Sequence, residues 1–311
     1  MSKLKGLLLT EGMHGMISQV EGLAKALNID YIHQKVELNK FTKFLPPKVT
    51  PVSSLFFKNF KVPEFDLIIS CGRKSVIPSI YLKKKAKKKI TNIHIQNPKV
   101  SLENFDYVIV PEHDGVKGQN VITSKGAIHY LTEYEIDKNR DYLKNKLNKE
   151  KQHLLLILGG PNRYYDYKED HLLNIFKKIK KIITSYNLQL IVIPSMRTPK
   201  NIIYLANNFF DKENLVIQNV DKKAYLSGLS LAKFILVTCD STSMISESAI
   251  TGKPIYVIEI PSKRDDFRFR QFRDLFNKLN IIKILDDKLE TWDYEKLDET
   301  NKIAQIIKKK L

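Results

Sequence analysis

Residues 237–257, VTCDSTSMISESAITGKPIYV, decide the fold of this chain. The apolar run FILV at 234–237 leads into a hydroxyl-rich turn, and a second run, IYVI at 255–258, follows the stretch between them. That stretch has a short helical pattern that ends at Gly252 and Pro254. Two buried strands joined by a helix predict a right-handed βαβ unit, and ligands of such sheets lie beyond the carboxyl ends of the strands. We therefore expect a ligand at the turn and at Glu247, the acidic residue inside the helix.

The length and composition are those of a soluble globular protein. A chain of 311 residues forms one large domain or two ordinary ones. Its longest apolar runs, such as 154–158, have the length of a strand and are far too short to span a membrane. The first residues have lysines and leucines but no small-residue cleavage site, so we interpret 4–10 as a strand and not as a signal peptide. Cys71 and Cys239 lack zinc spacing, and a reduced, cytoplasmic setting is expected.

The net charge of +18 raises the question of an anionic partner. Lysine greatly outnumbers arginine, and isoleucine and asparagine are abundant, which is what an AT-rich coding bias produces. The lysine run at 83–89 is interpreted as the end of a solvated helix, with contact to an anionic membrane as the alternative. If the excess is compositional, binding to anionic vesicles is weak and disappears near physiological salt. No RNA-binding or helix-turn-helix signature accompanies the charge, so nucleic acid is not expected as a partner.

The arginines are more informative than the lysines. In a lysine-rich chain, arginine is expected where its planar, bidentate fork is needed. All but Arg140 come shortly after a predicted strand, namely Arg73, Arg163, Arg197, Arg264, Arg268, Arg270 and Arg273. This distribution indicates phosphate or carboxylate binding along one edge of the sheets.

Short β patterns alternate with helical patterns along the whole chain. The predicted strands are 4–10, 31–36, 66–70, 92–96, 107–110, 121–123, 154–158, 190–194, 215–218, 234–238, 255–259 and 281–285. Valine, isoleucine and leucine dominate them without strict alternation, as in parallel strands covered on both faces. The charged interval 138–152 separates two such series. We predict an α/β fold with two Rossmann-like domains, 1–145 and 146–311, that face each other across a cleft. The last segment, 301–311, is amphipathic; it either packs back on the first domain or contacts a membrane surface.

Four features of the second domain are expected to converge on one ligand. Gly160 and Arg163 follow the first strand of this domain, where paired glycines allow close approach of a phosphate; an ordinary glycine turn is the alternative. Arg197 follows the second strand. The hydroxyls and N–H groups of Ser241, Thr242 and Ser243 open a helix after the fourth strand and form a ready anion site. Glu247, about one turn later, is expected to accept hydroxyls of a ribose, with a surface helix residue as the alternative.

These residues carry a resemblance to known families. DSTSM at 240–244, Glu247 and GKP at 252–254 resemble the donor-nucleotide motif of GT-B glycosyltransferases and the matching stretch of nucleotide-sugar 2-epimerases. Nearly the whole chain is similar to the mitochondrial-fission ELM family, whose bacterial members are described as candidate glycosyltransferases. The segments that carry this second resemblance are EGLAKAL at 21–27, HIQNP at 94–98, VPEHD at 110–114, LGGP at 158–161 and FRQF at 269–272.

The resemblance implies that the first domain binds the acceptor. GT-B enzymes often have a glycine loop after the first strand, sometimes with a catalytic histidine, which makes His14 a candidate general base; a positioning role is the alternative. The other residues expected on the acceptor side are Gly15, Gln19, Arg73, Gln96, His113 and Arg270. The triplet Glu112, His113 and Asp114 suggests a metal, but adjacent side chains point apart, so no metal site is expected.

The resemblance implies transfer of a sugar from a nucleotide-diphosphate donor to an unknown acceptor. GT-B enzymes generally need no metal, because cations and helix N-termini stabilise the leaving diphosphate, so no cofactor is expected besides the nucleotide-sugar substrate. Two alternatives stay open: a non-catalytic adaptor of the fission type with a retained nucleotide site, and an epimerase or hydrolase of the nucleotide sugar. The expected location is the cytoplasm, with contact to an anionic membrane as the peripheral option.

Overall fold

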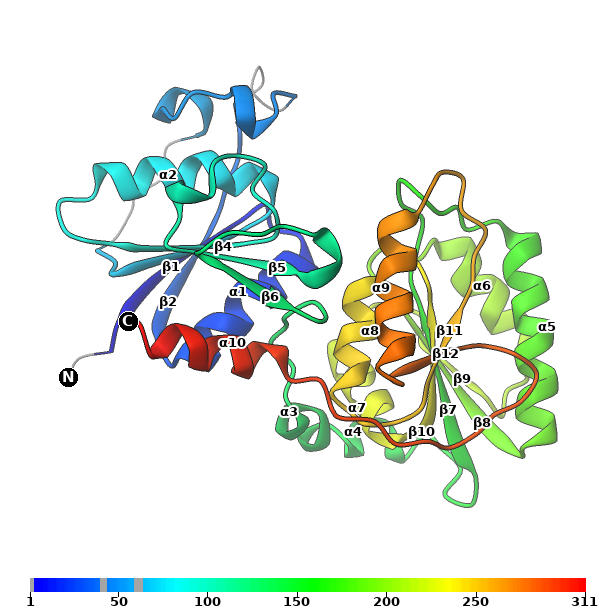
Figure 1. Cartoon of the computed structure of the whole chain (residues 1–311). Helices are drawn as coiled ribbons and strands as arrows, with labels where there is room; N and C mark the ends of the chain where they lie inside the picture. The colour runs from blue at the N-terminus through cyan, green and yellow to red at the C-terminus, as the bar shows by residue number, and fades with distance from the viewer. Residues whose placement is uncertain (1–2, 40–43, 59–63) are drawn as a thin grey trace. The chain divides into compact units, whose positions relative to one another are not determined.

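The computed structural model describes residues 3–39, 44–58 and 64–311 (Figure 1). The chain divides into two compact units. Unit 1 consists of Met1–Tyr130 together with Asp298–Leu311, and unit 2 consists of Leu131–Leu297. Each unit has its own parallel β-sheet with helices on both faces.

Unit 1 is built on a six-stranded sheet in the order β2-β1-β3-β4-β5-β6. Its strands are β1 (Lys5–Thr10), β2 (Asp30–Lys35), β3 (Leu67–Cys71), β4 (Thr91–Ile95), β5 (Tyr107–Pro111) and β6 (Val121–Ser124). Every neighbouring pair is parallel. All five residues of β3 are buried, because helices cover both of its faces.

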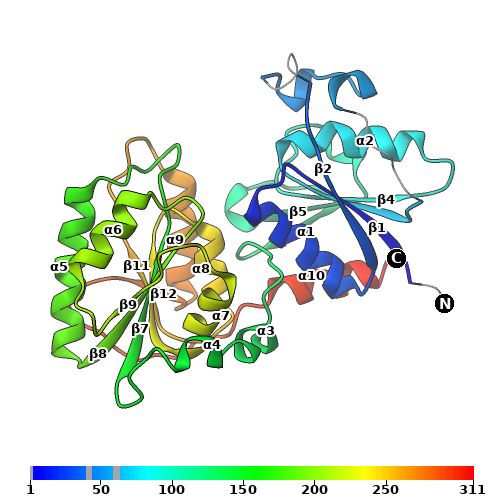
Figure 2. The same ribbon diagram turned by 180° about the vertical axis from the view of Figure 1, so that it is seen from behind.

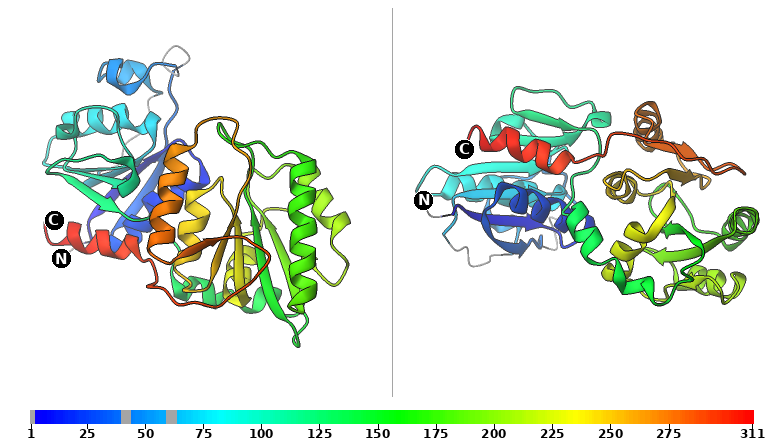
Figure 3. Two further views of the ribbon diagram at one scale, coloured as in Figure 1. Left: turned by 45° about the vertical axis from the view of Figure 1, so that its right-hand side comes forward. Right: turned by 90° about the horizontal axis from the view of Figure 1, so that it is seen from below.

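The helices of unit 1 lie on opposite faces of its sheet. Helices α1 (His14–Leu27) and α10 (Glu299–Lys308) pack on one face, and α2 (Val76–Lys85) packs on the other (Figures 1 and 2). Figure 3 shows α10, in red, next to α1. Ile303 and Ile307 of α10 are buried in the same core as Leu23 of α1. Burial of each such side chain contributes about 1.5–3 kcal/mol, so the last residues of the chain stabilise the unit formed by the first.

Short 3-10 helices and irregular segments make the remaining connections of unit 1. They are η1 (Pro47–Val49), η2 (Ser54–Phe56), η3 (Arg73–Ser75), η4 (Leu102–Asn104) and η5 (Glu112–Asp114). Among the described residues between β2 and β3, the helical elements are the short 3-10 helices η1 and η2.

Unit 2 is built on a second six-stranded parallel sheet, in the order β12-β11-β10-β7-β8-β9. Its strands are β7 (Gln152–Leu158), β8 (Leu188–Pro194), β9 (Leu215–Val216), β10 (Ala232–Thr238), β11 (Ile255–Ile258) and β12 (Ile282–Ile284). Helices α5 (Glu169–Ser185) and α6 (Lys200–Phe209) cover one face. The other face carries α7 (Lys222–Leu231), α8 (Thr242–Ala249) and α9 (Phe267–Lys278). The strand order reverses between β7 and β10, which is where ligands of such sheets bind.

Unit 2 begins earlier in the chain than the predicted boundary at 145 and 146. Two short helices, α3 (Glu133–Lys138) and α4 (Asp141–Lys144), pack against α7. Ser227 of α7 accepts a hydrogen bond from the Leu143 amide at 3.0 Å and donates one to the Arg140 carbonyl at 2.8 Å. These contacts place residues 131–145 in unit 2.

The predicted fold class, α/β with two Rossmann-like domains, is confirmed, and each of the twelve predicted strands is present. Strand lengths differ from the predicted ones by at most two residues; β9, for example, has two residues in place of four, and these are half-exposed at the sheet edge. Helix α1 starts at His14. No helix in residues 3–39, 44–58 and 64–311 combines the length and hydropathy that crossing a bilayer requires.

Candidate functional site

Helix α8 presents a hydroxyl-rich N-terminus at the carboxyl edge of the second sheet. Ser241 is its N-cap, and the Ser241 side chain accepts a hydrogen bond from the Met244 amide at 3.3 Å. Thr242 and Ser243 form the first turn and are half-buried. The first amides of a helix have no acceptor within it, and its dipole is positive at this end. The three hydroxyls and these amides together form a potential anion site.

Glu247 lies four residues after Ser243, on the same side of α8. Its side chain is half-buried, and the Tyr225 hydroxyl of α7 donates a hydrogen bond to its Oε2 at 2.9 Å. Burial raises the pKa of Glu247 to about 7, and the bond from Tyr225 opposes that rise. A ligand that donates two hydroxyl hydrogens to this carboxylate stabilises its charged form.

The buried carboxylate of Asp240 organises the loops next to α8. Asp240 is 3 % exposed and accepts three hydrogen bonds. Tyr167 Oη donates to Oδ1 at 2.5 Å, while the Gly160 amide and Arg197 Nη2 donate to Oδ2 at 3.1 and 2.7 Å. Burial is the larger cause, and the charge of Asp240 the second, of a raised pKa of Tyr167. The Tyr167 hydroxyl therefore stays protonated and donates its hydrogen bond. The buried charge is thus paired and hydrogen-bonded, as its desolvation requires.

Arg197 is held from two sides. Besides its ion pair with Asp240, its Nη1 donates to the Gly160 carbonyl at 2.7 Å. The side chain is still 35 % exposed, so part of the guanidinium faces outward. Arg197 is therefore fixed in position before any ligand arrives, and part of its charge is neutralised by the protein itself.

The two glycines after β7 are required by packing inside unit 2. A Cβ on Gly159 would lie 2.2 Å from Asp240 Oδ1, and one on Gly160 would lie 2.0 Å from the Arg197 carbonyl oxygen. Thr198 Oγ1 lies 2.8 and 2.5 Å from the Leu158 and Gly159 carbonyl oxygens, and its one hydroxyl hydrogen, donated to either of them, fixes the loop further. Packing within unit 2 therefore requires glycine at both positions, whether or not a ligand binds there. Arg163, beyond them, is exposed.

Arg270 and Arg273 of α9 belong to a second network of charges in unit 2. Arg270 bonds Asp265 at 2.7 Å and also Asp266. Arg273, 9 % exposed, donates to Asp266 Oδ2 and to Tyr165 Oη, both at 3.2 Å. Arg270, which was expected on the acceptor side, is thus paired with two carboxylates of its own helix start. Its contact with an acceptor stays a prediction.

The loops of unit 1 bring most of the predicted acceptor residues to the carboxyl edge of the first sheet. His14 and Gly15 begin α1 after β1 and are exposed. Arg73 follows β3, and its Nη2 donates to the Leu45 carbonyl at 2.9 Å. Gln96 follows β4 with a φ of +81°, a strained backbone conformation of the kind found at functional sites. His113 follows β5 in η5, with its Nε2 3.7 Å from Asp114 Oδ1.

Gln19 differs from this group. It is 8 % exposed, and its Oε1 accepts a weak hydrogen bond from Cys71 Sγ at 3.5 Å. The second turn of α1 directs this side chain toward β3 because α1 packs on the sheet there. The role of Gln19 as a substrate contact stays a prediction.

His94 on β4 is a buried core residue. Its Nδ1 lies 2.8 Å from Ser70 Oγ, and burial lowers its pKa to about 3. It is therefore neutral at physiological pH and serves packing. Among the described residues there is no cluster of three or more histidines, cysteines or carboxylates that would hold a metal ion.

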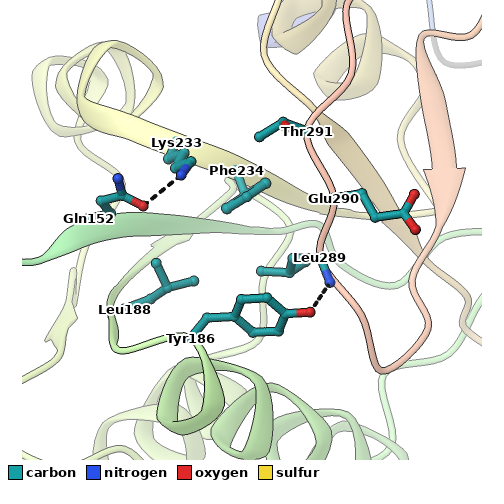
Figure 4. Close-up of a pocket in the computed structure, with 8 residues that line it drawn as sticks. All are labelled: Gln152, Tyr186, Leu188, Lys233, Phe234, Leu289, Glu290 and Thr291. Carbon is teal, nitrogen blue, oxygen red and sulfur yellow. Dashed lines mark hydrogen bonds between the residues drawn. The ribbon is translucent and has the colours of Figure 1, made fainter.

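A hollow of about 420 Å³ lies at the opposite, amino edge of the second sheet (Figure 4). Leu188, Phe234 and Leu289 line it. Two pairs of its polar groups already bond each other: Lys233 Nζ donates to Gln152 Oε1 at 2.8 Å, and the Leu289 amide donates to Tyr186 Oη at 2.9 Å. The hollow contains none of the predicted site residues. Ligands of parallel sheets bind at the carboxyl edge, so we place the candidate site there.

Two tyrosines at this edge, Tyr167 and Tyr225, are not identified by the sequence. Tyr225 bonds Glu247, and Tyr167 bonds Asp240, which in turn bonds the Gly160 amide and Arg197. Asp240 belongs to the motif at 240–244, but the sequence does not predict that its carboxylate holds the neighbouring loops together. The two tyrosines lie far from the motif in sequence, and no local pattern identifies them.

The family of the chain follows from comparison with known proteins. The family model described as "Mitochondrial fission ELM1" matches residues 14–311, and the chain belongs to this family, which confirms the resemblance seen in the sequence. An uncharacterized protein of Rickettsia prowazekii is 26% identical, over 78% of this chain and 79% of that protein. The mitochondrial fission protein ELM1 of Arabidopsis thaliana is 22% identical, over 79% of this chain and 64% of the plant protein.

Solved structures with a similar fold are nucleotide-sugar epimerases. The UDP-GlcNAc 2-epimerase of Methanocaldococcus jannaschii has a TM-score of 0.55 at 16% identity, covering 98% of this chain and 99% of the enzyme. The UDP-GlcNAc 2-epimerase of Neisseria meningitidis, bound to UDP-GlcNAc, has a TM-score of 0.51 at 12% identity, covering 99% and 100%. At these identities the likeness shows the fold, which is of the GT-B type.

Proposed function

We propose that this member of the mitochondrial fission ELM1 family binds a nucleotide-diphosphate sugar at the carboxyl edge of the second sheet and transfers the sugar to an acceptor. The observation that carries the proposal is the half-buried carboxylate of Glu247, one turn beyond the hydroxyl-rich N-terminus of α8. Epimerases of the same fold have been solved in complex with UDP-GlcNAc and with UDP, which supports a nucleotide sugar as the ligand class.

In the proposed complex the diphosphate lies at the N-terminus of α8. Ser241, Thr242 and Ser243 offer hydroxyls and amides to its oxygens, and Arg197, fixed by Asp240, offers its outward N–H groups. Arg163 is exposed after the glycine loop and supplies a second cation. Glu247 accepts the two hydroxyls of the ribose, while Tyr225 holds the carboxylate in place.

The same groups meet the charge that develops in the reaction. Cleavage of the bond between sugar and diphosphate leaves negative charge on the leaving oxygen, and a preorganised helix N-terminus and arginine stabilise it. His14, exposed on the first turn of α1, is the candidate base that takes the proton from the acceptor hydroxyl.

A second candidate function is an adaptor that binds a nucleotide without turning it over. One observation favours it. No hydrogen bond or ion pair orients His14 within the described part of unit 1, whereas a general base is usually held by a third group. Nucleotide binding is common to both candidates, and turnover of a nucleotide sugar separates them.

Calorimetry with UDP, GDP, ADP and CMP tests the binding site. We expect Glu247→Ala to lower the affinity for the nucleotide that the parent binds by about one to two orders of magnitude, because two charge-assisted hydrogen bonds are lost. Glu247→Gln keeps the shape and one acceptor and loses less. Glu213→Ala is the matched control, since Glu213 pairs with Lys151 on the surface near the amino edge.

The outcomes separate the candidates. Equal affinity of the parent and a folded Glu247→Ala variant excludes the ribose contact. A parent that binds nucleotide sugars but releases no nucleoside diphosphate with any acceptor fraction is the adaptor. A parent that binds no nucleotide at all excludes the proposed site.

A further inference from the structure

The segment of unit 1 that follows β2, residues 44–58, exposes an unusual number of large apolar side chains; we name it the excursion. Phe44 is 87% exposed, Leu55 78% and Val49 61%, and Leu45 and Val52 are also exposed. Isolated apolar side chains on a surface are ordinary, but five within twelve positions of one segment indicate an interaction surface.

The base of the excursion is fixed to the rest of unit 1. Phe57 is buried, and its ring lies 5.6 Å from that of Tyr81 on α2. Asn39 Nδ2 donates to the Leu55 carbonyl at 2.6 Å, and Arg73 holds the Leu45 carbonyl. Figures 1 and 2 show the segment, in blue, beyond α2 on the face away from α1. The exposed side chains are therefore displayed by an anchored base.

The surface around these side chains is cationic. Residues 44–58 contain Lys48 and Lys58 but no aspartate or glutamate. Lys84 and Lys85 lie three and four residues after Tyr81, on the side of α2 that meets the base of the excursion. Lys48, Lys84 and Lys85 are exposed, and none has an ion pair within residues 3–39, 44–58 and 64–311. By contrast, Lys83 and Lys88 of the same lysine run pair with Asp106 and Asp66.

The shape of this surface does not suit a peptide or a helix. The hollow between the excursion and α2, lined by Leu45, Pro47 and Ile77 among others, has a volume of only about 10 Å³. A protein partner buries its anchor side chains in well-packed pockets, whereas a bilayer accepts apolar side chains that project from the protein surface.

We propose that the excursion docks unit 1 on an anionic lipid bilayer. Phe44 and Leu55 enter the boundary between headgroups and acyl chains, while Lys48, Lys84 and Lys85 contact acidic headgroups. Since Arg73 holds the excursion and follows β3, the bilayer lies next to the carboxyl edge of the first sheet. This surface is independent of the nucleotide site in unit 2, so either proposal stands if the other fails.

Sedimentation with large vesicles tests the docking. We expect the full-length parent to sediment with phosphatidylcholine vesicles that contain phosphatidylglycerol at about 0.15 M salt, and far less with phosphatidylcholine alone. The double variant Phe44→Asp/Leu55→Asp is expected to lose about a hundredfold in partition or more, since each inserted side chain contributes about tenfold. Its residual, charge-driven binding disappears at the same salt. Lys48→Glu is expected to lose about tenfold, as it reverses one charge.

Tyr204→Asp is the matched control, because Tyr204 is 61% exposed on α6 of unit 2. It is expected to sediment like the parent, and circular dichroism checks that every variant folds. The proposal is overturned if the parent does not sediment with anionic vesicles, or if the double variant sediments as the parent does. A third outcome also overturns it: the parent does not bind vesicles, and light scattering shows a dimeric parent but a monomeric double variant. The surface then joins two copies of the chain.

Discussion

The carboxyl edges of the two sheets hold their charged side chains in different ways. In unit 2, Arg197 and Arg273 bond the buried carboxylates of Asp240 and Asp266. In unit 1, Arg73 bonds a main-chain carbonyl of the excursion, and His14 is exposed. Buried carboxylates fix a cation far more firmly than a carbonyl on the surface does. The two arginines at the edge of unit 2 are thus fixed before a ligand arrives. At the edge of unit 1, Lys74 is held in a similar way by Glu11, which is 13% exposed, while His14 is exposed on its loop.

The difference matters for function. A preorganised edge lowers the cost of binding a charged ligand, because its side chains are already ordered. This is what we propose for the nucleotide in unit 2. The edge of unit 1 offers exposed side chains and an anchored apolar excursion, which suit a larger and less polar partner.

The largest expected effect comes from removing the Asp240 carboxylate, which accepts hydrogen bonds from three groups of unit 2. We expect Asp240→Ala to lower the free energy of unfolding of unit 2 by about 3 kcal/mol, because it leaves Arg197, Tyr167 Oη and the Gly160 amide without their shared partner. Trp292, the one tryptophan of the chain, lies in unit 2, so its fluorescence during urea unfolding reports on this unit.

Asp141→Ala is the control for Asp240→Ala. Asp141 pairs with Lys144 on the surface of the same unit, and its side chain is 81% exposed. It should leave the urea midpoint unchanged. If Asp240→Ala is as stable as this control, the carboxylate does not organise the edge, and the contrast between the two units is lost.

The sequence predicts the fold better than it predicts the site. The strands were found because buried parallel strands form continuous Val, Ile and Leu runs, and these runs are interrupted by charged helices. The distribution of the arginines predicts phosphate or carboxylate binding, and the carboxylate that Arg270 and Arg273 bind belongs to the protein itself, at Asp266. An arginine in a lysine-rich sequence indicates a partner that accepts two parallel hydrogen bonds. The sequence does not show whether that partner belongs to the protein or to a ligand.

The excursion shows a second limit. Phe57 is buried and Phe44 is exposed, although both stand in the same apolar, proline-rich context. A periodic pattern tells the two faces of a helix or strand apart, whereas an irregular segment has no period. Only the packing of Phe57 on Tyr81 distinguishes the base of the excursion from its surface.

A medium effect is expected from pH, with opposite sign in the two units. Burial raises the pKa of Glu247 from 4.5 to about 7, so between these values folded unit 2 keeps a proton that the unfolded chain has lost. The contribution of Glu247 to the free energy of unfolding therefore falls by about 1–2 kcal/mol as pH rises from about 5 to 7. Burial lowers the pKa of His94 from 6.5 to about 3, so the unfolded chain binds the extra proton. The contribution of His94 to unit 1 therefore falls as pH drops from about 6.5 toward 3.

Each contribution is isolated by comparing the parent with one variant. Urea unfolding at pH 5 and pH 7, followed by Trp292 fluorescence, gives the pH slope of unit 2, which Glu247→Gln should make more positive. Far-UV circular dichroism follows both units, and His94→Gln should reduce the acid sensitivity of the part that Trp292 does not report. The contrast fails if both variants keep the pH slopes of the parent.

The smallest expected effect concerns Arg270, which has two possible roles. The ion pairs of Arg270 with Asp265 and Asp266 are at the surface, with a side chain 49% exposed, whereas Arg273 is buried against the same Asp266. Exposed pairs contribute little to stability, so Arg270→Ala should leave the urea midpoint of unit 2 almost unchanged, while Arg273→Ala should lower it clearly. The purely structural role predicts that nucleotide affinity and turnover also stay those of the parent. If Arg270 instead binds the acceptor, Arg270→Ala keeps nucleotide affinity but raises the KM for acceptor, and Arg270→Lys, which retains the charge, recovers part of it. The stability of Arg270→Ala and its KM together therefore decide whether this arginine completes the edge of unit 2 or serves a ligand.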